Sequence, residues 1–199
     1  MKFNYRKLAV GIFTSLMLTS AANAGDLLVY SSTDADNLKY YMDNFQKDNP
    51  DIKVKVVRES TGTMAAKMMA EKDNPQADVL FEMAATVALK METQGMFHPY
   101  TPKGMDKIDQ RYVDKEGEVN WVGNYGWAGC ICWNTIEAKK LGLPKPKSWA
   151  DLTNPIYKGL ISMPNPNSSG TGFLDVSSWI QVMGEDAAWT YMDALHKNV

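Results

Sequence analysis

The chain has 199 residues, with 21 basic and 23 acidic side chains and a formal net charge of −2. Residues 1–24 hold three of the bases and none of the acids, so residues 25–199 carry 18 bases against 23 acids, a net charge of −5. This acidic balance argues against a nucleic-acid partner, which favours a basic face. A small anionic ligand stays open, because local dipoles rather than net charge hold such a ligand.

The N-terminus has the order of features found in secretory signal peptides. A basic start precedes an apolar run at 8–18, and Ala22-Asn23-Ala24 supplies the small residues of a cleavage site. A membrane anchor is the alternative, but the apolar run is shorter than the about 20 residues that cross a bilayer. We therefore predict a cleaved signal peptide over 1–24 and export to the periplasm, with Gly25 as the first mature residue.

The following part of the chain alternates short apolar runs with amphipathic ones. In chain order, the sequence predicts a strand at 27–30, a helix ending at Asn49-Pro50, a strand at 54–57, a helix at 64–72, a strand at 78–81 and a helix at 84–94. The continuous apolar run Leu27-Leu28-Val29-Tyr30 is typical of a buried parallel strand. This βαβαβ order predicts a mostly parallel sheet with right-handed crossovers.

The second half is less regular. The sequence predicts irregular structure at 99–118, a long strand region at 121–133, a short helix at 135–141, a turn of helix opening at 148–151, a strand at 160–163, a loop at 164–170, and helices at 171–183 and 185–197. The run at 121–133 is rich in aromatic and β-forming residues. It is a candidate crossing between two lobes.

Four segments share one pattern, in which a strand ends, small or hydroxyl residues follow, and a helix begins. They are Ser31-Ser32-Thr33, Ser60-Thr61-Gly62-Thr63, Ala84-Ala85-Thr86 and Ser168-Ser169-Gly170-Thr171. Ligands of open parallel sheets bind at the carboxyl ends of the strands, where helix N-termini offer N–H groups and a positive dipole end to an anion. The pattern predicts a site for a phosphate-like or carboxylate-like head group, and ordinary helix capping is the alternative for each segment.

The segment 165–172 is the most specific of these. It places three hydroxyls and two glycines directly before a helix, which exceeds what capping requires. It is neither a phosphate-binding P-loop nor a nucleophile elbow. The sequence also has no zinc-protease motif, no Cys-x-x-Cys pair and no serine with evident His and Asp partners, so we expect no catalysis and no cofactor.

Three segments carry a resemblance to a known family. Ser60-Thr61-Gly62-Thr63, the run at 74–79 and the run at 163–174 resemble the type 2 periplasmic binding proteins of ABC importers. The chain looks most like the 2-aminoethylphosphonate-binding branch, whose close relatives bind hexose phosphates and, further off, ferric iron. Family members are longer, so the resemblance implies that the chain is the first part of one, incomplete at the C-terminus.

The resemblance implies an α/β fold of two hinged lobes that close on the ligand, with mostly parallel sheets and helices on both faces. Lobe 1 is expected at 25–123, and the crossing strand and the start of lobe 2 at 124–199. A monomer of this kind captures a small anionic solute and delivers it to a permease and ATPase complex in the inner membrane. The expected ligand-binding residues are Ser31, Ser32, Thr61, Gly62, Thr63, Ala85, Thr86, Ser168, Ser169, Gly170 and Thr171.

An aminophosphonate also carries an ammonium group, which needs a carboxylate or an aromatic face. Glu82, at the end of the third predicted strand, is a candidate, and a surface role is its alternative. Trp121, Tyr125 and Trp127 are candidates for an aromatic wall or for hinge packing.

Ferric iron is the alternative ligand. Iron binders of the superfamily often use two adjacent tyrosines late in the chain, with a His or carboxylate near the start. Here Tyr40-Tyr41 falls inside a predicted helix with Tyr41 on its apolar stripe, and His98 and His196 stand alone. These positions favour structural roles, so we expect no metal site.

The two cysteines, Cys130 and Cys132, are only two residues apart, and a bond between them would be strained. The resemblance implies that Cys132 pairs with a cysteine beyond Val199. Two small buried hydrophobic residues are the alternative.

Overall fold

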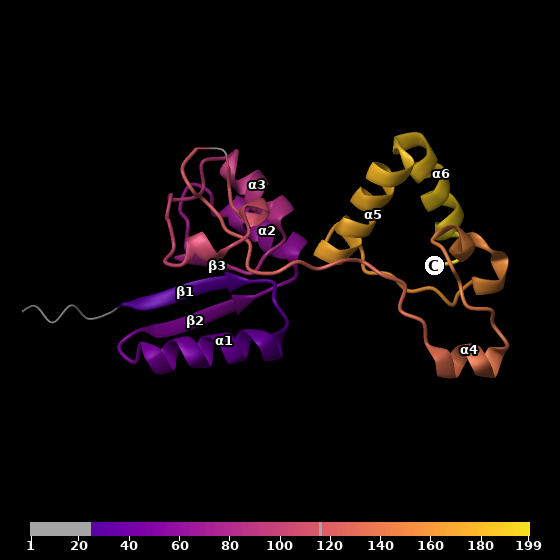
Figure 1. Cartoon of the computed structure of the whole chain (residues 1–199), viewed down its shortest axis with the longest axis horizontal. Coiled ribbons are helices and arrows are strands. Elements are labelled where there is room, and N and C mark those ends of the chain that lie inside the picture. The colour runs from indigo at the N-terminus through magenta and orange to yellow at the C-terminus, as the bar shows by residue number, and fades with distance from the viewer. Residues whose placement is uncertain (1–24, 116) are drawn as a thin grey trace, which may run out of the picture.

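The computed structural model describes residues 25–115 and 117–199, so the predicted signal peptide lies outside the described residues. Figure 1 shows two bodies placed along the long axis of the molecule and joined by a narrow waist. The first body holds all the strands, and the second holds the last three α-helices. Within the described ranges, no helix combines the length and the apolar character needed to cross a bilayer.

The first body is a three-stranded parallel sheet with helices on both faces. Its elements are β1 (Asp26–Ser31), α1 (Ala35–Asp48), β2 (Lys53–Arg58), α2 (Thr61–Ala70), β3 (Val79–Phe81) and α3 (Ala85–Glu92). The strand order is β2-β1-β3, and both pairings are parallel. Figure 1 shows α1 on one face of the sheet and α2 and α3 on the other. The predicted βαβαβ order and parallel sheet are confirmed.

The sheet register places the predicted site segments at one edge. Ser31 pairs with Arg58 on β2 and with Phe81 on β3, so the carboxyl ends of the three strands are level. β1 is the central strand, which explains its continuous apolar run, since Val29 and Tyr30 are each only 2% exposed. The segments that follow the three strands therefore emerge side by side.

Between the sheet and its helices lies the core of the first body. Tyr30, Met64, Met68 and Met91 are buried together there. Met64 and Met68 are one helical turn apart, so they present a single apolar face of α2 to the sheet. The hydroxyl of Tyr30 donates to Glu71 Oε2 at 3.0 Å, which satisfies the polar end of this otherwise apolar side chain.

The second body is built from α4 (Thr135–Leu141), α5 (Gly170–Met183) and α6 (Glu185–His196), with 3₁₀ turns at Ala150–Thr153 and Pro155–Tyr157. Two further 3₁₀ turns, Met105–Lys107 and Gln110–Tyr112, precede the waist. The bounds of α4 match the prediction. Its N-terminus is capped by the Asn134 side chain and its C-terminus by Gly142, whose φ is 65°.

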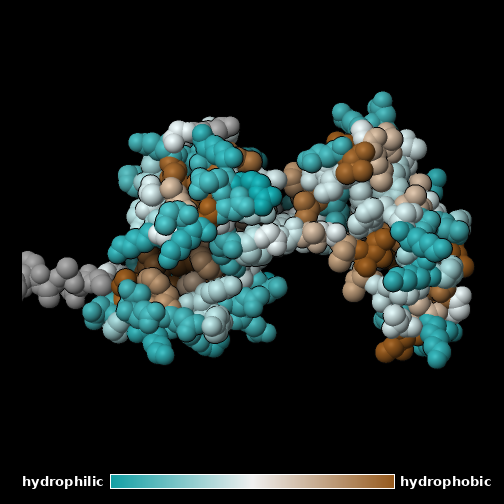
Figure 2. Space-filling model, in the orientation of Figure 1, coloured by the Kyte–Doolittle hydropathy of each residue, from teal (hydrophilic) through white to brown (hydrophobic). Residues whose placement is uncertain are grey.

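The core of the second body is centred on Trp179. This side chain is 4% exposed and makes edge-on contacts with the rings of Trp149 and Tyr191, at 5.5 and 5.1 Å between ring centres. Other apolar side chains of this body lie at the surface, including Val182 and Ile136, which are 84% and 77% exposed. Figure 2 shows this hydrophobic surface over the second body. The described residues therefore bury a small core here.

Two predicted strands, at 121–133 and 160–163, are wrong. Neither stretch forms a strand in the described part of the chain, and only an isolated antiparallel bridge joins Val113 to Val122. A strand needs a neighbour with which to exchange backbone hydrogen bonds. The apolar residues Ile161 and Met163 pack instead against the helical core around Trp179.

The stability of the second body is expected to fall in strong alkali. Burial raises the pKa of Tyr191 to about 12, with the nearby Asp175 carboxylate adding to the effect, and the Tyr191 hydroxyl donates to the Trp149 carbonyl at 3.0 Å. Below pH about 10 this hydroxyl is protonated in both the folded and the unfolded chain. Between pH about 10 and 12 the unfolded chain loses the proton first, which favours unfolding.

This effect is measured as the drop in Tm between pH about 9 and 11. Tyr191→Phe, which cannot ionise, is expected to show a smaller drop than the wild-type protein. Equal drops in the two proteins would mean that Tyr191 does not couple alkali to unfolding.

Candidate functional site

A cleft of about 1580 Å³ runs along the carboxyl ends of the strands and reaches the N-terminus of α5. Small-molecule pockets commonly measure about 300–1,000 Å³, so the described residues form walls rather than a closed cavity. Seven of the eleven predicted ligand-binding residues line the cleft: Ser32, Thr61, Ala85, Thr86, Ser169, Gly170 and Thr171. They come from both bodies.

The other four predicted residues, Ser31, Gly62, Thr63 and Ser168, do not line this cleft. Ser31 departs furthest from the expectation, because it is fully buried inside β1 and its hydroxyl accepts the N–H of Thr33 at 3.2 Å. It therefore shapes the turn after β1.

The segment after β2 differs from its prediction as a loop. α2 begins at Thr61 rather than at residue 64, so Thr61, Gly62 and Thr63 form its first turn. Ser60 occupies the N-cap position, but its hydroxyl makes no capping bond and instead donates to the carbonyl of Ser168 at 2.7 Å. The Ser60 hydroxyl thus forms a hydrogen bond between the two bodies.

The N-termini of α2 and α5 approach each other closely (Figure 1). The N–H of Gly62 donates to the Ser168 carbonyl at 2.9 Å. A Cβ on Gly62 would lie 2.4 Å from the Asn167 carbonyl oxygen, and one on Gly170 would lie 2.6 Å from Thr61 Oγ1. Gly62 is required for this approach because it faces backbone atoms, whereas a side chain at Gly170 would displace the Thr61 side chain.

The start of α5 is held by a cap and by another close contact. Ser169 is the N-cap residue, and its hydroxyl accepts the N–H of Gly172 at 3.4 Å. Gly172 is buried, and a Cβ there would lie 2.3 Å from the Pro164 carbonyl oxygen. The second glycine of the motif therefore packs the turn before α5, while Thr171 remains exposed on the cleft.

A chain of hydroxyls joins the first two segments. Thr61 Oγ1 donates to Ser32 Oγ at 3.2 Å, and Ser32 Oγ donates to the Glu82 carbonyl at 3.1 Å. Ala85 and Thr86 lie in the first turn of α3, whose N-cap residue, Ala84, has no side-chain capping bond. The N-terminus of α3 therefore presents backbone N–H groups beside these hydroxyls.

Sequence reasoning missed Arg58, the last residue of β2, which also lines the cleft. Its Nε donates to the Thr33 carbonyl at 2.5 Å, and its guanidinium lies 3.8 Å from the Asp34 carboxylate. The available signal was a basic residue at the end of a strand, directly before a hydroxyl segment. A guanidinium here is a cation within reach of an anionic ligand.

The three candidate aromatic residues take different positions. Trp121 lines the cleft, and its indole donates to Glu92 on α3 at 3.3 Å, which fixes it to the first body. Tyr125 and Trp127 also line the cleft and are 56% and 41% exposed. Burial raises the pKa of Tyr125, and the negative charge of the neighbouring Glu82 carboxylate adds to the rise.

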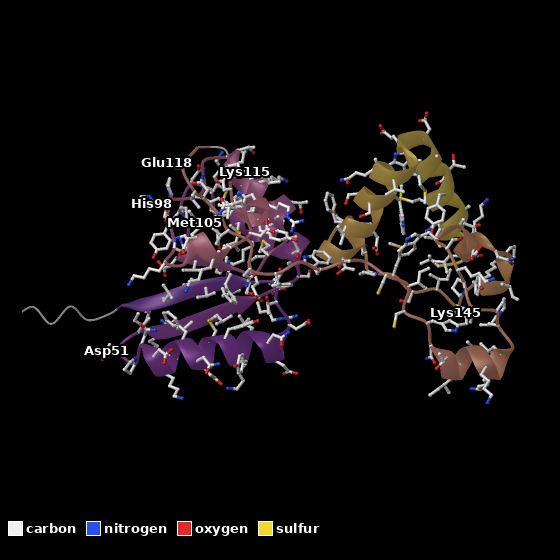
Figure 3. The ribbon with its side chains drawn as sticks, in the orientation of Figure 1. Asp51, His98, Met105, Lys115, Glu118 and Lys145 are labelled. Carbon is white, nitrogen blue, oxygen red and sulfur yellow. The ribbon has the colours of Figure 1, made fainter. Side chains whose placement is uncertain are left out.

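Tyr41 and His98, two of the residues weighed for iron, both line the large cleft. In the described part of the chain, no group of three His, Cys, Asp or Glu side chains could hold a metal ion. His98 lies in the first body, at the end far from α5 (Figure 3). Tyr41, which the sequence placed on the apolar stripe of a helix, is 42% exposed and packs edge-on against Phe81, with ring centres 5.6 Å apart.

Both cysteines, Cys130 and Cys132, are free and exposed. The alternative that they are buried hydrophobic residues is therefore wrong. A pairing of Cys132 with a residue beyond Val199 stays a prediction.

Residues 74–199 match the family described as bacterial extracellular solute-binding protein. An uncharacterized protein of Haemophilus influenzae is 32% identical over the whole chain, and "Probable ABC transporter periplasmic-binding protein y4fP" of Sinorhizobium fredii is 26% identical over 97% of it. The chain spans 59% and 54% of these two relatives, little more than half of each.

Solved structures show the same similarity. The periplasmic binding protein AfuA from Actinobacillus pleuropneumoniae, with exogenous fructose-6-phosphate bound, is 32% identical, with a TM-score of 0.75 over 88% of this chain and 56% of AfuA. Iron-bound HitA from Pseudomonas aeruginosa is 21% identical, with a TM-score of 0.66 over 86% of this chain and 54% of HitA, and this likeness is one of fold alone. The predicted type 2 periplasmic-binding-protein fold is thereby confirmed.

Proposed function

The chain belongs to the bacterial extracellular solute-binding proteins, and from this premise we propose that it is the periplasmic binding component of an ABC importer for a phosphonate or a phosphorylated small solute. The best candidate ligand is 2-aminoethylphosphonate. The loaded protein delivers this solute to a permease and ATPase complex in the inner membrane. The matched family is one of binding proteins, which agrees with the expectation that the chain is not an enzyme.

The observation that carries the proposal is the convergence of neutral and cationic donors on one cleft. The hydroxyls of Ser32, Thr61 and Thr171 line it, together with the N-termini of two helices, α3 and α5. Arg58 adds a guanidinium at the same edge. A phosphonate or phosphate group accepts several hydrogen bonds at once, and bonds to a charged acceptor are stronger than neutral ones.

The similarity to AfuA supports a phosphorylated ligand, because fructose-6-phosphate is bound to that protein. The y4fP relative supports an ABC importer as the system that the chain serves. Closure of two lobes around the ligand removes water and strengthens each hydrogen bond in the site. The hydrogen bond from the Gly62 N–H to the Ser168 carbonyl joins the N-termini of α2 and α5, so the two walls of the proposed site lie against each other.

Calorimetric titration of the full-length mature protein tests the proposal. The ligands are 2-aminoethylphosphonate, a hexose phosphate, inorganic phosphate and ferric citrate, and we expect tight binding of one phosphorus compound. Ser169→Ala and Thr171→Ala are each expected to weaken that binding by about 1–3 kcal/mol, because they remove a donor that desolvation makes valuable.

Thr190→Ala is the matched control, since this exposed hydroxyl on α6 bonds the Asp186 carbonyl and does not line the cleft. It is expected to bind like the wild type. Unchanged affinity in both site variants would remove the assignment of the α5 N-terminus. Binding of ferric ion alone would favour the iron alternative.

A further inference from the structure

Glu82 has an unusual backbone conformation for its residue type. Its φ is 52°, and no other non-glycine residue in the described ranges has a positive φ. The left-handed region costs roughly 1–2 kcal/mol for an ordinary residue. Two bonds hold it there, since the Glu82 carbonyl accepts the N–H of Ser32 at 3.3 Å and the Ser32 hydroxyl at 3.1 Å. The turn after β3 therefore fixes the direction in which the Glu82 side chain leaves the sheet.

The Glu82 carboxylate lies on the cleft without a cationic partner. Its oxygens accept from the Asn124 amide at 2.6 Å and from the Thr33 hydroxyl. Among the described residues, no Lys, Arg or His side-chain nitrogen lies within 4.0 Å of its oxygens. Two other carboxylates on the same cleft are paired, because Asp34 faces Arg58 and Glu71 faces Lys67. A third, Asp78, accepts the backbone N–H of Leu28 at 2.8 Å.

This unpaired negative charge stands beside groups suited to an anion. The Ser32 hydroxyl connects Glu82 to the hydroxyl segments, because it accepts from Thr61 and donates to the Glu82 carbonyl. A carboxylate a few ångströms from a bound phosphonate repels it, and the repulsion grows as water leaves the site. A ligand that carries its own cation next to its anionic group turns this repulsion into attraction.

Aromatic rings complete the surroundings of Glu82. Tyr125 lies close enough for the Glu82 charge to raise the pKa of its hydroxyl, in addition to the larger effect of burial. Phe81, the last residue of β3, also lines the cleft, and its ring contacts that of Tyr41. A cleft that holds both a carboxylate and aromatic rings is a favourable environment for an ammonium group.

From this arrangement we infer that Glu82 is a specificity-determining residue that selects a zwitterionic ligand. Its carboxylate binds the ammonium group of an aminoalkylphosphonate, while the neighbouring hydroxyls and Arg58 hold the phosphonate. This inference rests on the proposed function, because it assumes that the hydroxyl side of the cleft binds a phosphorus anion.

The test compares two ligands of the same length that differ in the cation. The full-length mature protein is titrated with 2-aminoethylphosphonate and with propylphosphonate, which replaces the ammonium by a methyl group. The wild type is expected to bind the aminophosphonate at least about tenfold more tightly. Glu82→Gln removes the charge at nearly constant shape and is expected to bring the ratio of the two affinities close to one.

Two further variants make this result decisive. Glu82→Asn also removes the charge, and asparagine tolerates the left-handed backbone, so this variant is expected to fold and to lose the discrimination. Asp34→Asn is the matched control, because it removes a cleft carboxylate that already has a cation partner. Its affinities for the two ligands are expected to change together, which leaves their ratio as in the wild type.

The outcomes separate this inference from the proposed function. A wild type that binds both phosphonates equally, or a ratio unchanged in Glu82→Gln and Glu82→Asn, overturns the role of Glu82 and leaves the capture of phosphorus compounds intact. A wild type that binds no phosphorus compound overturns both.

Discussion

Gly62→Ala is expected to lower the affinity for the anionic ligand at least about tenfold. The new methyl group would lie 2.4 Å from the Asn167 carbonyl oxygen and 2.8 Å from the Ser168 Cα, and both are backbone atoms that cannot rotate away. The segment before α5 must therefore move away from α2, which lengthens the bond from the Gly62 N–H to the Ser168 carbonyl. Forced shifts of this kind cost roughly 1–3 kcal/mol, and displacement of binding groups by about 1 Å is enough to lose much of their effect.

The measurement is calorimetric titration with the phosphorus compound that the wild type binds, together with the Tm of each protein. Gly126→Ala is the matched control, because Gly126 lines the same cleft and a Cβ there would meet no atom within 4 Å. It is expected to keep wild-type affinity. If Gly62→Ala also binds like the wild type, the close approach of α2 and α5 is no part of the ligand site.

The sequence predicted helices best where local chemistry determines their ends. α4 begins after the Asn134 cap and ends at Gly142 in the left-handed region, and both signals can be read from residues next to the helix. The strands of the first body could be predicted equally well, because continuous apolar runs in βαβαβ order favour one topology.

The stretches 121–133 and 160–163 show the limit of this reasoning. Their β-forming composition is real, but composition does not supply a neighbouring strand, and none pairs with them in the described part of the chain. Ile161 packs on the Trp179 core instead, a long-range contact that no local pattern encodes.

The candidate site was predictable at the level of segments and less so at the level of single residues. Level strand ends bring the hydroxyl segments to one edge, as the parallel order implies. Which hydroxyl faces the cleft depends on where β1 ends, because Ser31 is the last, fully buried residue of the strand and Ser32 follows it on the cleft. The positive φ of Glu82 has no sequence signal, since glutamate is a poor residue for that conformation.

Trp179→Ala is expected to reduce the free energy of unfolding by about 3–5 kcal/mol, the range observed when a large buried aromatic side chain is removed. The side chain is 4% exposed and lies between the rings of Trp149 and Tyr191, so the change deletes two aromatic contacts and leaves a cavity. A loss of this size is a large part of the stability of an ordinary domain. Chemical denaturation of the full-length protein measures it.

The consequence for binding follows from the position of Trp179 on α5. Ser169 and Thr171 lie at the N-terminus of this helix and line the cleft. Weaker packing around Trp179 is therefore expected to make the position of these two binding residues less well defined. Trp189→Ala is the matched control, because Trp189 lies on the adjacent α6 but is 51% exposed, and its loss is expected to cost less than about 1 kcal/mol. Similar losses in the two variants would show that Trp179 is not the centre of the second core. A large loss in Trp179→Ala alone, accompanied by weaker ligand binding, would show that this core holds the α5 wall of the site in place.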